Sequence, residues 1–327
     1  MVIGAATGAK RATVSEDSDA RLCSFALSSL FGESSTMTTL RTRLGDGSVL
    51  PVPGVADALQ ARLVESLGFE ALFLSGSGVS FANLGRPDVG LVNQVEMVDR
   101  IAAIADVVDL PLLVDGDNGH GNALNVIRTV RSFERAGASA IMLEDQVFPK
   151  RCGHLAGTRV VPATEMVGKL QAAVDCRRSE DFLIIGRTDA RGVEGLSAAI
   201  DRAHLYREAG ADILLIEAPR SETEMATIAE TFAGIPLVAN MVEGGATPQL
   251  DNASLAAVGF QIIFYPSTIV RAAVFAARNA LNELKEQKTT RHLTDRMVGF
   301  AELNALVGID EIGELENRFV RAEESPT

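Results

Sequence analysis

Residues 140–154 read A-I-M-L-E-D-Q-V-F-P-K-R-C-G-H, an apolar run that passes through two acids into a loop. The run Ala140–Leu143 predicts a strand whose carboxyl end brings carboxylates to the edge of a sheet. The loop holds two cations, a thiol and an imidazole within five residues, and cationic neighbours favour the thiolate of Cys152. A solvated basic loop is the alternative interpretation, but four reactive groups together favour chemistry.

Seven further apolar runs lie on either side of this stretch, and helical patterns separate them. Their hydrophobicity is continuous, which suits parallel strands covered on both faces. Eight strand–helix units favour an α/β fold of the closed (β/α)₈ TIM type over an open doubly wound sheet. The expected strands are residues 49–55, 71–76, 111–115, 140–144, 182–187, 213–217, 236–240 and 261–265.

The regions outside these units predict the domain organisation. Residues 1–36 are rich in Ser, Thr, Ala and Gly, and we interpret them as a mobile N-terminal extension. Residues 37–327 are predicted to be a single α/β barrel domain. Helical periodicity continues past the last strand, and C-terminal helices at about 270–327 are expected to cap the barrel or to contact a neighbouring subunit.

Composition argues against several classes of function. The net charge of −13 argues against nucleic acid or an anionic membrane surface as a partner. No apolar run reaches the ~20 residues of a membrane span. Three cysteines make no disulfide framework, so a reducing cytoplasm fits best. No dinucleotide-binding fingerprint occurs, and hydride transfer is therefore not favoured.

Polar residues follow the expected strands at the carboxyl end, the face on which barrel enzymes do their chemistry. Core packing alone would not place acids and an arginine there so regularly. These residues are Ser75–Gly78, Asp115, Asp117, Glu144, Asp145, Arg187, Asp189, Glu217 and Asn240.

The residue types at this rim indicate a metal-assisted reaction of a carboxylate. Asp115, Asp117 and Glu144 are hard oxygen ligands without clustered His or Cys, which suits Mg²⁺ or Mn²⁺. Backbone N–H groups of the turn at residues 75–78 can bind an anion, and Arg187 suits a carboxylate or phosphonate, although it is also typical of a salt bridge. The parts favour making or breaking a bond beside pyruvate through an enolate.

Six motifs occur in order, and with them residues from about 37 to 321 resemble the isocitrate lyase/phosphoenolpyruvate mutase superfamily, in its methylisocitrate lyase and carboxyphosphonoenolpyruvate mutase branch. The resemblance implies an α/β barrel whose eighth helix is exchanged between subunits of a dimer or tetramer. The motifs are Ser75-Gly-Ser-Gly, Gly85-Arg-Pro-Asp-Val-Gly, Asp115-Gly-Asp-Asn-Gly-His-Gly, Glu144-Asp-Gln, Pro149-Lys-Arg-Cys-Gly-His and Arg187-Thr-Asp-Ala.

The resemblance also implies a role for each matching residue. Mg²⁺ would be held by Asp115, Asp117 and Glu144. Cys152 would be the general acid, supported by His154. The remaining catalytic residues would be Arg187, which holds a distal carboxylate, and Asp88, which lies close to the metal-bound substrate. The other substrate-binding residues would be Ser75, Gly76, Ser77, Lys150, Arg151, Gly153, Glu217 and Asn240.

The expected reaction is Mg²⁺-dependent cleavage of a 2-hydroxy di- or tricarboxylate, of the 2-methylisocitrate or 2-alkylmalate type, to pyruvate and a second carboxylate. The alternatives are a carboxyphosphonoenolpyruvate-type phosphonomutase and an oxaloacetate decarboxylase. A barrel that binds a metabolite without catalysis is a fourth interpretation, which the intact set of site residues disfavours.

Four residues depart from the family pattern. Gly116 and Gly186 replace larger residues and are expected to leave more room near the metal and near Arg187. His120 replaces an aromatic residue, which would alter packing or proton supply beside the metal. Arg86 stands where Leu is common, either to serve a more anionic substrate or to lie in solvent.

Overall fold

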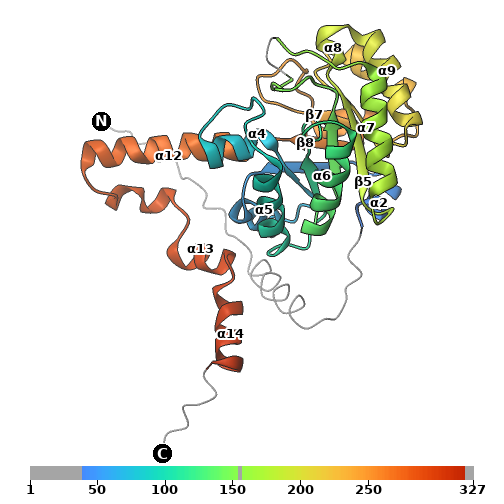
Figure 1. Cartoon of the computed structure of the whole chain (residues 1–327). Helices are drawn as coiled ribbons and strands as arrows, with labels where there is room; N and C mark the ends of the chain where they lie inside the picture. The colour runs from blue at the N-terminus through green and yellow to red at the C-terminus, as the bar shows by residue number, and fades with distance from the viewer. Residues whose placement is uncertain (1–38, 154–156, 321–327) are drawn as a thin grey trace, which may run out of the picture. The chain divides into compact units, whose positions relative to one another are not determined.

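Eight parallel strands form a nearly closed barrel in the computed structural model, which describes residues 39–153 and 157–320 (Figure 1). Each strand from β1 to β5 pairs with the next, β1 also pairs with β8, and β8 pairs with β7. A single bridge between Leu214 and Leu237 joins β6 to β7. The predicted TIM-type barrel is confirmed. The strands are β1 (Leu50–Val55), β2 (Leu72–Leu74), β3 (Leu112–Asp115), β4 (Ala140–Glu144), β5 (Leu183–Thr188), β6 (Ile213–Ile216), β7 (Val238–Asn240) and β8 (Ile262–Tyr265).

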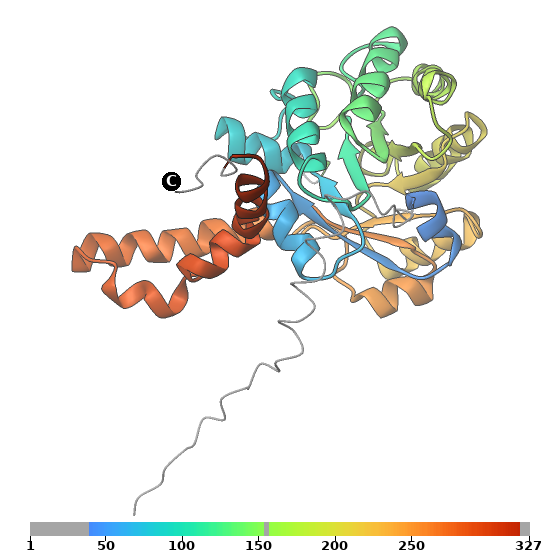
Figure 2. The ribbon, with the colours of Figure 1, turned by 90° about the horizontal axis from the view of Figure 1, so that it is seen from below.

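Helices cover the outside of the strand ring (Figure 2). The predicted helices are present, and α5 and α6 begin at the capping boxes of Asn93 and Asn122. Two short helices were not predicted, α4 and α8, which follow β2 and β5, and neither was the π-helical turn η1, which follows α4. The elements of the barrel are α2 (Leu40–Gly45), α3 (Ala58–Ser66), α4 (Gly76–Val79), η1 (Ser80–Leu84), α5 (Gln94–Ala105), α6 (Ala123–Ala136), α7 (Ala163–Cys176), α8 (Ala190–Val193), α9 (Leu196–Glu208), α10 (Glu222–Thr231) and α11 (Asn252–Val258).

Alternate residues of each strand belong to two separate apolar cores. In β4, Ala140 and Met142 lie in a cluster with residues from the other strands, which is the barrel interior. Ile141 and Leu143 lie in the layer between strands and helices. Because side chains alternate along a strand, Glu144 follows Met142 into the barrel mouth. The same alternation directs Asp115 of β3 and Arg187 of β5 inward.

The chain continues beyond the barrel as helices. The residues described form two compact units, 39–298 and 299–320. Helix α12 (Thr268–Gln287) buries only Val270 among its residues, and η2 (Arg291–Arg296) follows it. The second unit contains α13 (Phe300–Leu306) and α14 (Ile309–Phe319). Within the described ranges, no helix is long and apolar enough to cross a membrane. The extension predicted for residues 1–36 lies outside these ranges.

Candidate active site

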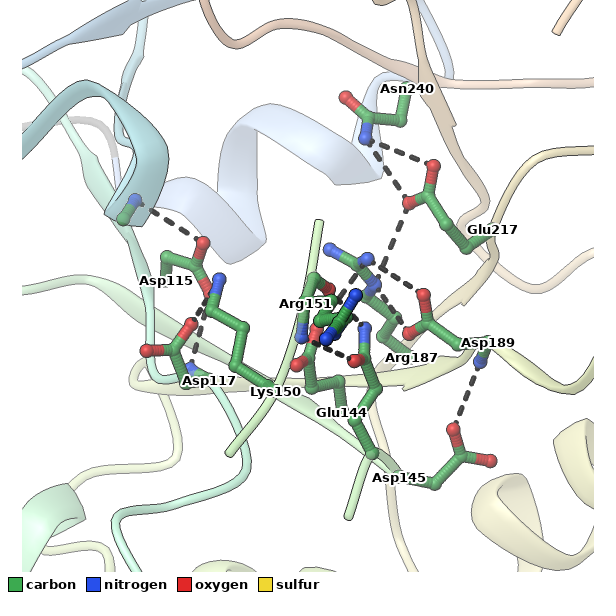
Figure 3. Close-up of polar contacts among 12 residues, drawn as sticks. Asp115, Asp117, Glu144, Asp145, Lys150, Arg151, Arg187, Asp189, Glu217 and Asn240 are labelled. Atoms are coloured by element: carbon green, nitrogen blue, oxygen red, sulfur yellow. Dashed lines mark hydrogen bonds and ion pairs between the residues drawn. The ribbon is translucent and has the colours of Figure 1, made fainter. Parts of the chain in front are cut away.

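Lys150 links the loop after β4 to two acids at the barrel mouth, Asp88 and Asp117, of which Figure 3 labels Asp117. Its Nζ atom lies 2.6 Å from Asp88 Oδ1 and 2.8 Å from Asp117 Oδ1. Burial lowers the pKa of Lys150, but Asp117, Asp115 and Glu144 outweigh this effect and raise that pKa well above its ordinary value. Lys150 is therefore a buried, charged cation that neutralises carboxylates of the predicted metal site.

Asp115 and Asp117 lie next to each other after β3. The N–H group of Asp117 donates to Asp115 Oδ1 over 3.1 Å, and the N–H group of Gly76 donates to Asp115 Oδ2 over 3.2 Å. Burial and the Asp117 carboxylate raise the pKa of Asp115. A Cβ atom on residue 76 would lie 2.9 Å from Asp115 Oδ2, so the close approach of this turn requires glycine. The hydroxyls of Ser75 and Ser77 hydrogen-bond to each other over 2.8 Å.

Arg187 is surrounded by three carboxylates (Figure 3). Its Nε and Nη2 atoms donate to the two oxygens of Asp189, both over 2.9 Å. Glu144 Oε2 lies 3.4 Å from Nη2, and Glu217 Oε2 lies 3.5 Å from Nε. Asn240 donates through Nδ2 to both oxygens of Glu217. Arg187, Glu217 and Asn240 are therefore joined by contacts through Glu217, although they come from three strands.

Asp189 gives this cluster a measurable pH dependence. Burial raises its pKa to about 6 from an ordinary 3.8, although Arg187 lowers it. The folded state thus holds the proton more tightly than the unfolded chain, and the stabilisation is complete below pH ~4 and lost as the pH rises through 6. We expect Asp189→Asn to gain stability relative to the parent protein between pH 4 and 6. Urea unfolding in chelator measures this; a constant difference across that range contradicts it.

Gly153, which directly follows Cys152, lies against the Arg187 cluster. A Cβ atom on residue 153 would lie 2.5 Å from Asp189 Oδ1, 2.7 Å from Arg187 Nη2 and 2.7 Å from Glu217 Cγ. Cys152, the residue before it, is partly exposed. The chain thus brings the thiol to the same end of the barrel as the acids. His154, the predicted partner of the thiol, lies outside the described residues.

The side chain of Glu144 suits a divalent cation. Glu144 is 1% exposed, and neither of its side-chain oxygens has a hydrogen-bond partner among the described residues. Burial raises its pKa well above the ordinary value, although Arg187 opposes this. Unpartnered hard oxygens beside Asp115 and Asp117 fit Mg²⁺ or Mn²⁺. Within residues 39–153 and 157–320, however, no three acids, His or Cys are gathered closely enough to hold an ion.

Two of the departures do not act as predicted. A Cβ atom on residue 116 would lie 2.7 Å from Ile141 Cγ1, and one on residue 186 would lie 3.1 Å from Ala211 Cβ. Both glycines therefore face the layer between strands and helices. The expectation that Gly116 and Gly186 leave room near the metal and Arg187 is wrong, because strand alternation turns them away from the barrel mouth.

The other two departures differ in their surroundings. Arg86 is exposed. His120 packs edge-on against Phe133, and its Nδ1 atom lies 3.3 Å from the Thr129 hydroxyl. The Thr129 hydroxyl donates its proton to the Gly119 carbonyl and therefore accepts a hydrogen bond from His120. The Nδ1 atom of His120 is thus the protonated ring nitrogen. Burial lowers the pKa of His120, although Asp117 and Asp115 oppose this, which favours the neutral ring.

Sequence reasoning gave no role to three buried polar residues beside the site. Gln146 is 1% exposed and hydrogen-bonds to the backbone of Arg151. Lys169 of α7 donates to the Asn118 carbonyl over 3.1 Å. Asp145 is fully buried and accepts hydrogen bonds from four residues. The sequence signals were the Glu-Asp-Gln motif for both Asp145 and Gln146 and, for Asp145, its place among the polar residues at the carboxyl ends of the strands. The partners of Asp145 are Thr188, Asp189, Arg202 and Tyr206.

Comparison with known sequences gives consistent matches. The sequence model for phosphoenolpyruvate phosphomutase matches residues 40–285. The chain is 46% identical to 2,3-dimethylmalate lyase of Eubacterium barkeri, over 87% of this chain and 98% of that one. It is 43% identical to 2-methylisocitrate lyase of Aeropyrum pernix, over 82% and 86%. It is also 40% identical to the chloroplastic carboxyvinyl-carboxyphosphonate phosphorylmutase of Arabidopsis thaliana, over 86% and 84%.

Solved structures of similar fold agree with these matches. A crystal structure of 2,3-dimethylmalate lyase, a PEP mutase/isocitrate lyase superfamily member, aligns with a TM-score of 0.82 at 34% identity and covers 86% of this chain and 94% of that one. A phosphonopyruvate hydrolase in complex with oxalate and Mg²⁺ aligns with a TM-score of 0.79 at 32% identity and covers 87% and 99%.

Proposed function

Because the chain belongs to the phosphoenolpyruvate phosphomutase family and is a carbon–carbon lyase, we propose that it cleaves the C2–C3 bond of a 2-hydroxy carboxylate to pyruvate and a second carboxylate. The observation that carries this proposal is the position of Gly153, the residue after Cys152, against Arg187. A thiol at that point suits protonation of the departing carbon, whereas phosphoryl transfer and decarboxylation need no acid there.

The acids at the strand ends are proposed to hold Mg²⁺. Asp115, Asp117 and Glu144 would bind it, and the relative crystallised with oxalate and Mg²⁺ supports this choice. When bound, the ion supplies Lewis-acid polarisation of the oxygens at the pyruvate half of the substrate. The Lys150 ammonium, now 2.8 Å from Asp117, would then be released toward Asp88 or toward the substrate.

The side chains divide the remaining work. The 2-hydroxyl gives its proton to solvent, from which the Cys152 thiolate regains one at the end of the cycle, while the C2–C3 electron pair stays with C3 and a carbonyl forms at C2. The departing fragment is then an enolate-like carboxylate, which Arg187 is placed to hold. Cys152 Sγ would give its proton to C3 and complete the second product. Glu217 and Asn240 keep Arg187 in position through the contacts described above.

The charges of the site favour a dicarboxylate over a tricarboxylate. Lys150 is matched by Asp88 and Asp117, and Arg187 by three acids. Asp189 occupies Nε and Nη2 of the Arg187 guanidinium, both over 2.9 Å. A third substrate carboxylate would add charge where the cations are already neutralised, which is unfavourable in a buried site. We therefore propose a 2-alkylmalate as the preferred substrate.

The deciding experiment measures pyruvate release from 2,3-dimethylmalate, racemic 2-methylisocitrate and oxaloacetate, each with Mg²⁺ and with chelator. We expect metal-dependent pyruvate from the hydroxy acids, with a kcat/KM at least about 10-fold higher for dimethylmalate, the equivalent of one weak charge contact. Pyruvate from oxaloacetate alone would establish decarboxylation instead. If none of the three substrates releases pyruvate, phosphonates are the next substrates to test, with phosphorus NMR as the measurement.

Gly153→Ala tests the contact between loop and site. The added methyl group has no space among Asp189, Arg187 and Glu217, so residues 152 and 153 must shift. A displacement near 1 Å lowers turnover by about 100-fold. Gly168→Ala in α7 is the matched control, since nothing lies within 4 Å of its Cβ position. The control should retain turnover and gain up to about 1 kcal/mol of stability. Equal turnover in both variants would show that the loop does not contribute to the active site.

We propose that the C-terminal helices contact another copy of the chain in a dimer or tetramer. Helix α12 exposes Val274, Phe275 and Leu281, at 52%, 66% and 64%. Such a row of apolar side chains is typical of a protein–protein interface. Light scattering coupled to gel filtration measures the subunit number, and a monomer at micromolar concentration would contradict the proposal.

A further inference from the structure

We infer that Gln146 is a positioning residue for Cys152, and that its carboxamide fixes the loop by binding both polar groups of one loop residue. Gln146 Oε1 accepts from the Arg151 N–H group over 2.9 Å, and Gln146 Nε2 donates to the Arg151 carbonyl over 2.8 Å. Both contacts end one residue before the thiol. The inference deepens the proposed function and rests on it for the role of Cys152.

The base of this arrangement is Asp145, which is fixed in the core. Its Oδ2 atom accepts from the Thr188 and Tyr206 hydroxyls, both over 2.7 Å, and its Oδ1 atom accepts from the Asp189 N–H group over 2.9 Å. Arg202 adds a contact of 3.3 Å. A carboxylate with this many partners holds its backbone firmly, so the peptide that follows it is an anchored starting point.

The stem of the loop begins at that anchor. Gln146 forms an antiparallel bridge with Val160, and hydrogen bonds join Val161 N–H to the Asp145 carbonyl and Val147 N–H to the Arg159 carbonyl, over 2.8 and 2.9 Å. The two ends of the loop are therefore tied together, with the Gln146 side chain on the loop side. Since Gln146 is 1% exposed, water does not compete for its amide.

The two hydrogen bonds transmit this rigidity to the thiol. A single bond would fix only one of the two peptide units that flank Arg151. The two bonds fix both, the Lys150–Arg151 unit through its N–H group and the Arg151–Cys152 unit through its carbonyl. The direction of the chain at residues 152 and 153 is then fixed, and Gly153 lies in contact with Arg187 and Asp189. Among the described residues, the Gln146 carboxamide hydrogen-bonds only to Arg151 and makes no hydrogen bond to those groups or to the metal acids. It acts through Cys152, by holding the acid at the distance that proton transfer requires.

Gln146→Met removes both hydrogen bonds and keeps the side-chain length. We expect kcat for pyruvate release to fall about 100-fold, the cost of misplacing a catalytic group by about 1 Å, while oxalate binding in Mg²⁺ is retained. We also expect iodoacetamide to alkylate Cys152 several-fold faster, as followed by peptide mass spectrometry. Cys176 is buried and is the internal control, because its alkylation rises only if the fold loosens.

Gln261→Met is the matched variant. Its Nε2 atom also donates to a backbone carbonyl, that of Leu44, but at the amino end of β8. It should leave kcat and Cys152 alkylation unchanged. The inference is overturned if Gln146→Met keeps parental kcat and alkylation, or if Cys152 and Cys176 accelerate together. If the parent protein releases no pyruvate but Cys152 alkylation still rises in Gln146→Met, the proposed function is wrong and the positioning of Cys152 by Gln146 is still supported.

Discussion

Cys152→Ser is expected to lower the rate of pyruvate release by a factor of about 10²–10⁴, the contribution of a positioned general acid. Serine keeps the size of the side chain, but its hydroxyl is a far weaker acid than a thiol. The loop contacts of Lys150 and Gly153 do not involve the sulfur and should remain. Binding of oxalate in the presence of Mg²⁺ should therefore stay close to that of the parent protein. Steady-state kinetics and calorimetry measure the two effects separately.

Cys176→Ser is the matched control for this prediction. Cys176 lies buried in α7, where its Sγ atom is 3.5 Å from the Ala173 carbonyl. That variant should lose some stability and retain turnover. Full turnover in Cys152→Ser would show that the thiol is not the acid, and a loss of oxalate binding as well would show that it is needed to form the site.

Glu144→Gln should abolish the response of the protein to Mg²⁺ without lowering its stability in chelator. The Glu144 oxygens are buried without hydrogen-bond partners, so the carboxylate is kept at a cost that the neutral amide reduces. Arg187 keeps Asp189 and Glu217 as partners. The parent protein should gain about 2.7 kcal/mol at an Mg²⁺ concentration 100 times Kd, and the variant should gain none. Turnover should fall by at least about 100-fold.

Asp212→Asn provides the contrasting control, because Asp212 is a carboxylate with good partners at the opposite end of the barrel. It accepts from Arg177 over 2.6 Å and from Arg41 over 2.9 Å. Its loss should lower stability in chelator and leave the Mg²⁺ response intact. Thermal unfolding with and without Mg²⁺ measures both variants. An Mg²⁺ response that survives in Glu144→Gln would remove Glu144 from the metal site.

Together the two predictions separate the halves of the proposed reaction. Glu144 belongs to the strand end where the pyruvate half would bind, and Cys152 to the loop that faces the departing carbon. Lys150 joins these halves, since it lies on the loop and contacts Asp88 and Asp117. A variant of either residue should therefore affect one half of the reaction. Comparing its ligand binding with its turnover shows which half is affected.

The sequence by itself determined the strands, and with them the rim. The apolar run of residues 140–143 is local information, and its end at Glu144 needs no knowledge of the rest of the chain. The observed strand β4 has the predicted bounds, Ala140–Glu144. The reactive loop, the acids after β3 and the arginine of β5 were likewise predicted from short stretches. Parallel strands then bring them together, because all their carboxyl ends meet at one face of a barrel.

Only the tertiary structure decided which way side chains face and which of them meet. Strands covered on both sides are apolar throughout, so alternation leaves no trace in their sequence. That is why Gly116 and Gly186 were expected at the barrel mouth, although they face the helices. The partners of Asp145 and Gln146 could not be predicted for a related reason. They come from α9, from β5 and from a loop closed by long-range hydrogen bonds. A contact between distant segments depends on how the whole barrel closes, which no short stretch of sequence encodes.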